Sequence, residues 1–181
     1  MNSKQMIEQL VGFNTVSRDS NLSLIEFVQN YLDDHGVAST RVVSDDGEKS
    51  NLYATIGPVE EGGVVLSGHT DVVPVDGQDW HTDPFLLTED NGRLYGRGTC
   101  DMKGFIGIAL SLVPEMRSLR RPIHLALSYD EEVGCRGAPA MIERMVTDIP
   151  APKAVIVGEP TGMGAVTGHK GIVGLKTTVR G

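Results

Sequence analysis

The chain lacks the features that mark several large classes of protein. Its only cysteines, Cys100 and Cys135, have no CxxC spacing and predict no disulfide scaffold. No apolar run is long enough to cross a bilayer, and the N-terminal MNSKQMIEQL has no basic-then-apolar signal pattern. We therefore expect a cytoplasmic protein that does not bind a membrane.

Basic residues are also scarce relative to acidic ones. The 181 residues include 16 lysines and arginines against 24 aspartates and glutamates, which gives a net charge of −8. A surface of this sign repels phosphate backbones, so we expect no nucleic-acid partner. Hydrophobic residues make up 40% and charged residues 22%, which is ordinary for a globular protein with a real core.

Apolar strands alternate with amphipathic helices along most of the chain. Helices are expected over 3–12, 21–36, 102–113 and 135–146, and strands over 37–43, 51–57, 122–129 and 153–158. The segment 62–74 is expected to be a short apolar strand that runs into a polar loop, and 164–171 to be hairpin-like. Ser3 is expected to cap the first helix and Ser20 or Asn21 the second, and Asn91-Gly92 should turn a hairpin. This order predicts an α/β fold of three layers (α/β/α) with a mostly parallel sheet.

The segment 172–181 has a different pattern. Apolar and polar side chains alternate there, which is typical of a strand with one solvated face in an antiparallel sheet. A single strand of this kind cannot bury its apolar side without partner strands. We therefore expect one domain over 1–171 and, over 172–181, the first strand of an incomplete second domain.

Acidic and imidazole side chains follow four of the apolar or turn segments. They are His69 and Asp71 after VVLSG, Asp101 after YGRGTC, Asp130 to Glu132 after LALSY, and Glu159 after AVIVG. In a parallel sheet the carboxyl ends of the strands meet at one edge, where these charges would repel. Divalent cations among them would remove that repulsion.

Each of these residues also has a simpler interpretation. His69 and Asp71 point the same way in an extended segment, so Asp71 could orient the ring of a metal-ligating His69, or the two could form a surface hydrogen bond. Asp101 could cap the following helix. Glu131 and Glu132 could be solvated charges. We favour the metal site because all of these acidic and imidazole groups stand, one after another along the chain, at the ends of the predicted strand or turn segments.

The runs GHTDVVP, GRGTCDMKG, YDEEVG and GEPT resemble the signature runs of the M20 metallopeptidase family over nearly the whole chain. The resemblance implies two divalent metal ions, zinc first and cobalt as an alternative. It implies that Asp101 bridges them, that His69 and Glu159 bind one, and that Glu132 binds the other. Glu131 would be the general base, and the Asp101–Met102 peptide bond would be cis.

The resemblance also implies hydrolysis of a linear amide bond in a small N-acylated amino acid. The runs WHTDPF and TGHKG are most similar to the branch of the family that deacetylates N-acetyl-L-ornithine in arginine biosynthesis. Alternatives are desuccinylation of N-succinyl-diaminopimelate, another aminoacylase or peptidase reaction, and a non-catalytic metal-binding relative. An intact Glu131 argues against the last, because a site that only binds metal needs no base.

The family's further histidine ligand and its lid histidine have no counterpart in this sequence. None of the remaining histidines has the right place; they are His35, His81, His124 and His169. We therefore expect this chain to be part of a longer enzyme, inactive or nearly so by itself. The resemblance implies that 1–171 is the catalytic, metal-binding domain and that 172–181 begins the lid or dimerisation domain. It also implies that the longer protein forms a homodimer through this lid.

Overall fold

The computed structural model describes residues 1–168, 171, 173 and 175–180. The helices are α1 (Ser3–Gly12), α2 (Leu22–Asp34), α3 (Lys103–Ser111) and α4 (Ala138–Asp148), with a 3-10 helix η1 (Val113–Ser118). The strands are β1 (Ser39–Val43), β2 (Ser50–Ile56), β3 (Val64–His69), β4 (Thr88–Asp90), β5 (Arg93–Tyr95), β6 (Ile123–Ser128) and β7 (Ala154–Val157). None of these helices is long and apolar enough to cross a membrane.

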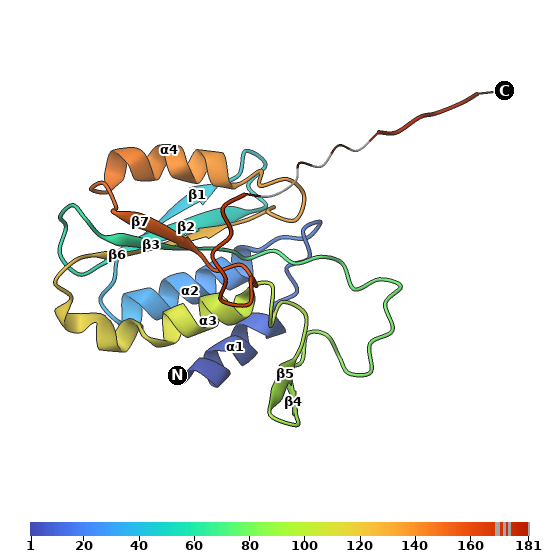
Figure 1. The fold of residues 1–181 in the computed structure, drawn as a ribbon, viewed down its shortest axis with the longest axis horizontal. Coiled ribbons are helices and arrows are strands. Elements are labelled where there is room, and N and C mark those ends of the chain that lie inside the picture. The colour runs from blue at the N-terminus through green and yellow to red at the C-terminus, as the bar shows by residue number, and fades with distance from the viewer. Residues whose placement is uncertain (169–170, 172, 174, 181) are drawn as a thin grey trace.

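A five-stranded sheet in the order β1-β2-β6-β3-β7 forms the middle layer. The β6–β3 and β3–β7 pairs are parallel, and β2 is antiparallel to both β1 and β6. Thus β1, β6, β3 and β7 point one way and β2 runs the opposite way. Helix α4 covers one face of the sheet, and α1, α2 and α3 lie on the other (Figure 1). The expected three-layer α/β fold with a mostly parallel sheet is confirmed.

Two apolar clusters hold the layers together. The larger lies between α1, α2, α3 and the sheet and includes Leu10, Ile25, Leu110 and Leu125, which are all nearly inaccessible. The smaller lies under α4. The helical spacing of apolar residues predicted these contact faces, because a 3.6-residue period places them on one side of each helix.

The helix caps and the hairpin turn predicted from the sequence are confirmed only in part. The first helix is capped by Asn2, not Ser3, because Asn2 and Gln5 exchange hydrogen bonds in a capping box. Asn21 stands at the start of α2, but its side chain makes no capping bond and instead contacts Ser50 and Thr70. The Asn91-Gly92 hairpin between β4 and β5 is confirmed.

The end of the chain is not part of this sheet. The described residues among 164–180 carry no strand, so the hairpin-like segment and the strand expected there are absent from the part that the structure describes. Residues 169, 170, 172, 174 and 181 lie outside the described residues. The division of the chain at 171 and 172 stays a prediction.

Candidate metal centre

The polar segments predicted to meet do lie at one edge of the sheet. Strand β3 ends at His69, β6 at Ser128 and β7 at Val157, and these three strands are parallel neighbours. The acidic residues therefore follow the carboxyl end of each strand within a few positions. Asp101 reaches the same edge from the segment just before α3.

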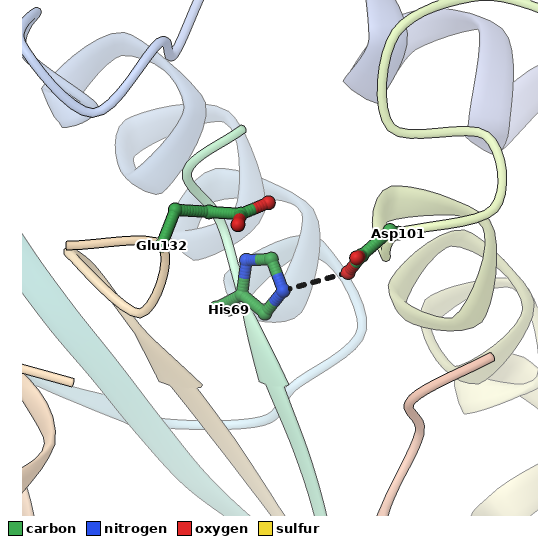
Figure 2. Close-up of side chains that lie close together, drawn as sticks. All are labelled: His69, Asp101 and Glu132. Carbon is green, nitrogen blue, oxygen red and sulfur yellow. Dashed lines mark hydrogen bonds and ion pairs between the residues drawn. The ribbon is translucent and has the colours of Figure 1, made fainter. Parts of the chain in front are cut away.

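An imidazole and two carboxylates converge there. The nearest donor atoms of His69, Asp101 and Glu132 all lie within 4.8 Å of one another. The Nε2 atom of His69 is 2.9 Å from Oδ1 of Asp101. Figure 2 shows the His69 ring at the end of its strand, with Asp101 approaching from the α3 side and Glu132 from the loop after β6.

The other predicted site residues surround the same ring. Glu159 Oε1 lies 3.7 Å and Glu131 Oε2 4.0 Å from His69 Nε2. Asp71 Oδ1 lies 3.6 Å from the opposite ring nitrogen, Nδ1. The structure thus brings together all six residues that the sequence singled out, although their roles stay predictions.

The contact that orients the His69 ring differs from the expected one. Nδ1 lies 2.9 Å from the main-chain oxygen of Asp71 and farther from its carboxylate. A carbonyl oxygen only accepts hydrogen bonds, so Nδ1 carries a proton and Nε2 faces the acidic cluster. The ring is 2% exposed, which fixes this orientation by packing as well.

The carboxylate of Asp71 has a different task, which is to hold the loop after β6. Its two oxygens accept the backbone N–H groups of Glu131 at 3.1 Å and Glu132 at 3.3 Å. Ser17 Oγ donates to the same carboxylate at 2.7 Å. Sequence reasoning missed Ser17, since nothing in the local sequence signals a contact with a residue 54 positions away.

The segment that carries Asp101 is folded tightly against the start of α3. A side chain at Gly104 would meet the Thr99 carbonyl oxygen at 2.1 Å, so only glycine permits this approach. The Asp101–Met102 peptide bond is cis, as the family resemblance implies. Lys103 is fully buried and donates from Nζ to the main-chain oxygen of Phe13 at 2.7 Å.

The charges of the site favour positive charge at its centre. Burial lowers the pKa of His69, but the adjoining Asp71 and Asp101 outweigh burial and raise the pKa to about 9. Burial, followed by the negative charge of Asp101, raises the pKa values of both Glu132 and Glu159. Burial raises the pKa of the Asp71 carboxyl, but the adjoining His69 ring and the hydrogen bond from Ser17 lower it by more. The pKa is therefore below its ordinary value, and the carboxyl stays ionised.

This donor set suits a divalent metal ion. One imidazole nitrogen and several carboxylate oxygens are the ligands that zinc, cobalt and manganese accept. Burial and, after it, the negative charge of Asp101 raise the pKa values of Glu132 and Glu159, and a bound cation would oppose both effects. His69, Asp101, Glu132 and Glu159 are therefore able to hold such an ion, and its identity is left open by the donor set.

Two of the other described histidines have partners outside the cluster. His124 is buried in β6, where its Nδ1 pairs with Thr55 Oγ1 at 2.9 Å, and burial lowers its pKa. His35 follows α2, and its Nδ1 contacts a main-chain oxygen at 2.7 Å. His169 lies outside the described residues.

Comparisons with known proteins identify relatives of this chain. Acetylornithine deacetylase from Pasteurella multocida is 38% identical in an alignment of 187 residues. The alignment covers 98% of this chain and 48% of that protein. The chain thus spans about half the length of the curated relatives it matches. Human carnosine dipeptidase 1 is similar in structure, with 27% identity and a TM-score of 0.67 over 81% of this chain and 35% of that one.

A further solved structure supports the fold alone. The M20 family metallo-carboxypeptidase Sso-CP2 from Sulfolobus solfataricus is 22% identical, with a TM-score of 0.75 over 87% of this chain and 37% of that one. Residues 65–172 match the family model of peptidase family M20/M25/M40. This match includes His69, Asp101, Glu132 and Glu159 and covers more than half of the chain. The chain therefore belongs to peptidase family M20/M25/M40.

Proposed function

We propose that the protein containing this chain is a metal-dependent amide hydrolase that removes the acetyl group from N-acetyl-L-ornithine. The observation that carries this proposal is the convergence of His69, Asp101 and Glu132 within 4.8 Å, with Glu131 beside them. Metal ligands and an adjacent free carboxylate are the two parts that amide hydrolysis requires at neutral pH.

His69, Asp101, Glu132 and Glu159 would hold the metal in this proposal. When bound, a divalent cation supplies Lewis acidity, which lowers the pKa of water and polarises the amide carbonyl. The Asp71 main-chain oxygen keeps the proton of His69 on Nδ1, so that Nε2 is directed at the cluster. Two divalent ions, zinc first, are proposed on the basis of the family resemblance.

Glu131 is proposed as the general base. Its carboxylate reaches to 4.0 Å from His69 Nε2, while its backbone N–H is held by Asp71. From this place it would take a proton from the attacking water and deliver it to the leaving amine nitrogen. The C–N bond of the amide breaks, the oxygen of water joins the acetyl carbon, and the products are acetate and free ornithine, with water as the second substrate.

The choice of substrate rests on the deacetylase relatives. The match to the Pasteurella multocida enzyme extends over 98% of this chain, which supports the acetyl-ornithine reaction. The similarity to human carnosine dipeptidase 1 at 27% identity favours a dipeptide as a second candidate. Desuccinylation of N-succinyl-diaminopimelate is a third, since the same metal and base would serve it.

The experiment is a comparison of substrates with the protein at its natural length. The zinc-loaded protein is offered N-acetyl-ornithine, N-succinyl-diaminopimelate and a histidine-containing dipeptide at equal concentrations. Preference for N-acetyl-ornithine, lost after treatment with a chelator, is the expected result. Preference for either of the other two would keep the mechanism and replace the substrate. Failure to hydrolyse any amide would overturn the proposed activity.

A further inference from the structure

We propose that Lys49 is a positioning residue of the metal centre. Its ammonium group joins the acidic loop, which we define as residues 129–137, to the segment that holds Asp71. This inference rests on the proposed function, because the groups that it positions are Glu131 and Glu132. Neither the family match nor the resemblance in sequence assigns a role to Lys49.

The contacts of Lys49 reach two separate parts of the chain. Its Nζ lies 2.5 Å from Asp130 Oδ1 and donates to the main-chain oxygen of Ser17, also at 2.5 Å. The side chains of Lys49 and Asp130 are only 16% and 14% exposed. An ion pair so shielded from water is coupled more strongly than a surface pair, and removal of one partner leaves the other poorly solvated.

On the loop side, Asp130 makes the turn that aims the two glutamates. Its φ of +57° lies in the left-handed region, which aspartate adopts only at single turn positions. Directly after this turn, the N–H groups of Glu131 and Glu132 both donate to the Asp71 carboxylate. A fixed Asp130 side chain therefore fixes the direction in which the following two residues leave the strand.

On the other side, Ser17 holds the same Asp71 carboxylate. Ser17 Oγ donates to Asp71 Oδ2 at 2.7 Å, and Ser17 N donates to the main-chain oxygen of Val72 at 3.1 Å. Lys49 thus contacts the residue that holds Asp71 and the residue that precedes the glutamates. Both sets of contacts lead to the carboxylate of Asp71, and the main-chain oxygen of the same residue orients His69.

The ends of the acidic loop are held independently of Lys49. Asn51 is fully buried, and its side chain accepts from Tyr129 N at 3.2 Å and donates to the Gly137 oxygen at 3.0 Å. Within the loop, the Cys135 N–H donates to the Glu131 oxygen at 3.1 Å. Since these bonds close the loop, loss of Lys49 is expected to shift its acidic part without unfolding it.

The test uses Lys49→Met in the protein at its natural length, with Lys49→Arg as the conservative variant. Lys4→Met is the matched control, because Lys4 pairs with Glu89 on the exposed surface. Cobalt binding is followed by its visible absorption bands, well below the unfolding temperature. We expect roughly tenfold weaker binding and shifted bands for Lys49→Met, recovery with arginine, and no change for the control.

Hydrogen exchange of the Glu131 and Glu132 amides gives a second readout that needs no metal. We expect faster exchange at both amides in Lys49→Met, because the bonds to Asp71 are weakened. Asp130→Asn should reproduce both effects, and the double variant should be no worse than either single one. If Lys49→Met fails to fold, Asp130→Asn carries the same test, since it removes the other partner of the same ion pair.

Two failures can be told apart. Cobalt binding, band positions and amide exchange in Lys49→Met equal to those of the wild type would overturn the positioning role, even if the variant melts at a lower temperature. A wild-type protein that binds no cobalt would overturn the proposed metal centre and, with it, the role of Lys49.

Discussion

The Asp71 carboxylate accepts the backbone N–H of Glu131 at 3.1 Å, so the proposed base is held by the residue whose main chain orients the proposed ligand His69. This arrangement couples two functions through one residue. A shift of Glu131 would therefore also disturb Asp71, the residue that orients His69. The first prediction follows from this coupling.

Asp71→Asn should weaken both metal binding and turnover. The amide side chain keeps one carbonyl oxygen, so it can no longer accept from Ser17 and both glutamate N–H groups equally well. Metal affinity should fall about 10- to 100-fold, measured by competition with a chelator. Asp76→Asn, which removes an exposed partner of Arg18, is the control and should leave affinity unchanged. An Asp71→Asn protein with normal affinity would show that this carboxylate does not support the site.

Glu131→Gln should separate chemistry from metal binding. The substitution removes the proton acceptor but keeps the side-chain volume and the backbone N–H bond to Asp71. Turnover of the best substrate should fall by about 10² to 10⁴-fold, while the metal content by elemental analysis stays the same. Equal losses of metal and turnover would instead make Glu131 a ligand.

Metal binding should depend steeply on pH because of His69. With a pKa of about 9 in the metal-free protein, the ring is protonated at neutral pH, and a metal ion must displace that proton. Apparent affinity should therefore fall about tenfold for each pH unit below about 9. Calorimetric titration in buffers between about pH 6 and 8 checks this. A flat profile over that range would contradict the protonated state of His69.

The buried Lys103 gives a separate prediction on stability. Burial lowers its pKa to about 7, although the charge of Asp71 opposes the shift. Because the folded pKa lies below the unfolded value, the charged lysine destabilises the fold most below about pH 7, and this penalty disappears as pH rises towards about 10.5.

Lys103→Met should therefore be more stable than the wild type at low pH, with a difference that shrinks as pH rises above 7. The lost hydrogen bond to the Phe13 oxygen costs about 1 kcal/mol at every pH and leaves the trend unchanged. Urea unfolding of the metal-free proteins at several pH values measures it. A difference that is constant with pH would mean that Lys103 keeps its ordinary pKa.

The sequence was sufficient to predict the strand-end site because its signals are local. An apolar run followed at once by His69, or by Asp130 to Glu132, predicts a strand and the edge at which it ends. The rule that parallel strands end at one edge then places distant residues together. The convergence around the His69 ring agrees with that rule.

The supporting contacts could not be predicted, because they join residues far apart in the chain. Lys49 and Asp130 are 81 positions apart, and no local pattern indicates that the two side chains pair. The same applies to Ser17 and Asp71. The helix cap was missed for a different reason: Asn2 and Ser3 are both good caps, and only the reciprocal Gln5 bond decides between them.

The proposed metal centre is tested most directly by locating the metal with anomalous diffraction from zinc-loaded crystals of the protein at its natural length. We expect a peak within coordination distance of His69 Nε2 and of the Asp101 and Glu132 carboxylates. A protein that crystallises with zinc present but shows no peak there, or shows its peaks only at other surface groups, would contradict the proposed metal centre.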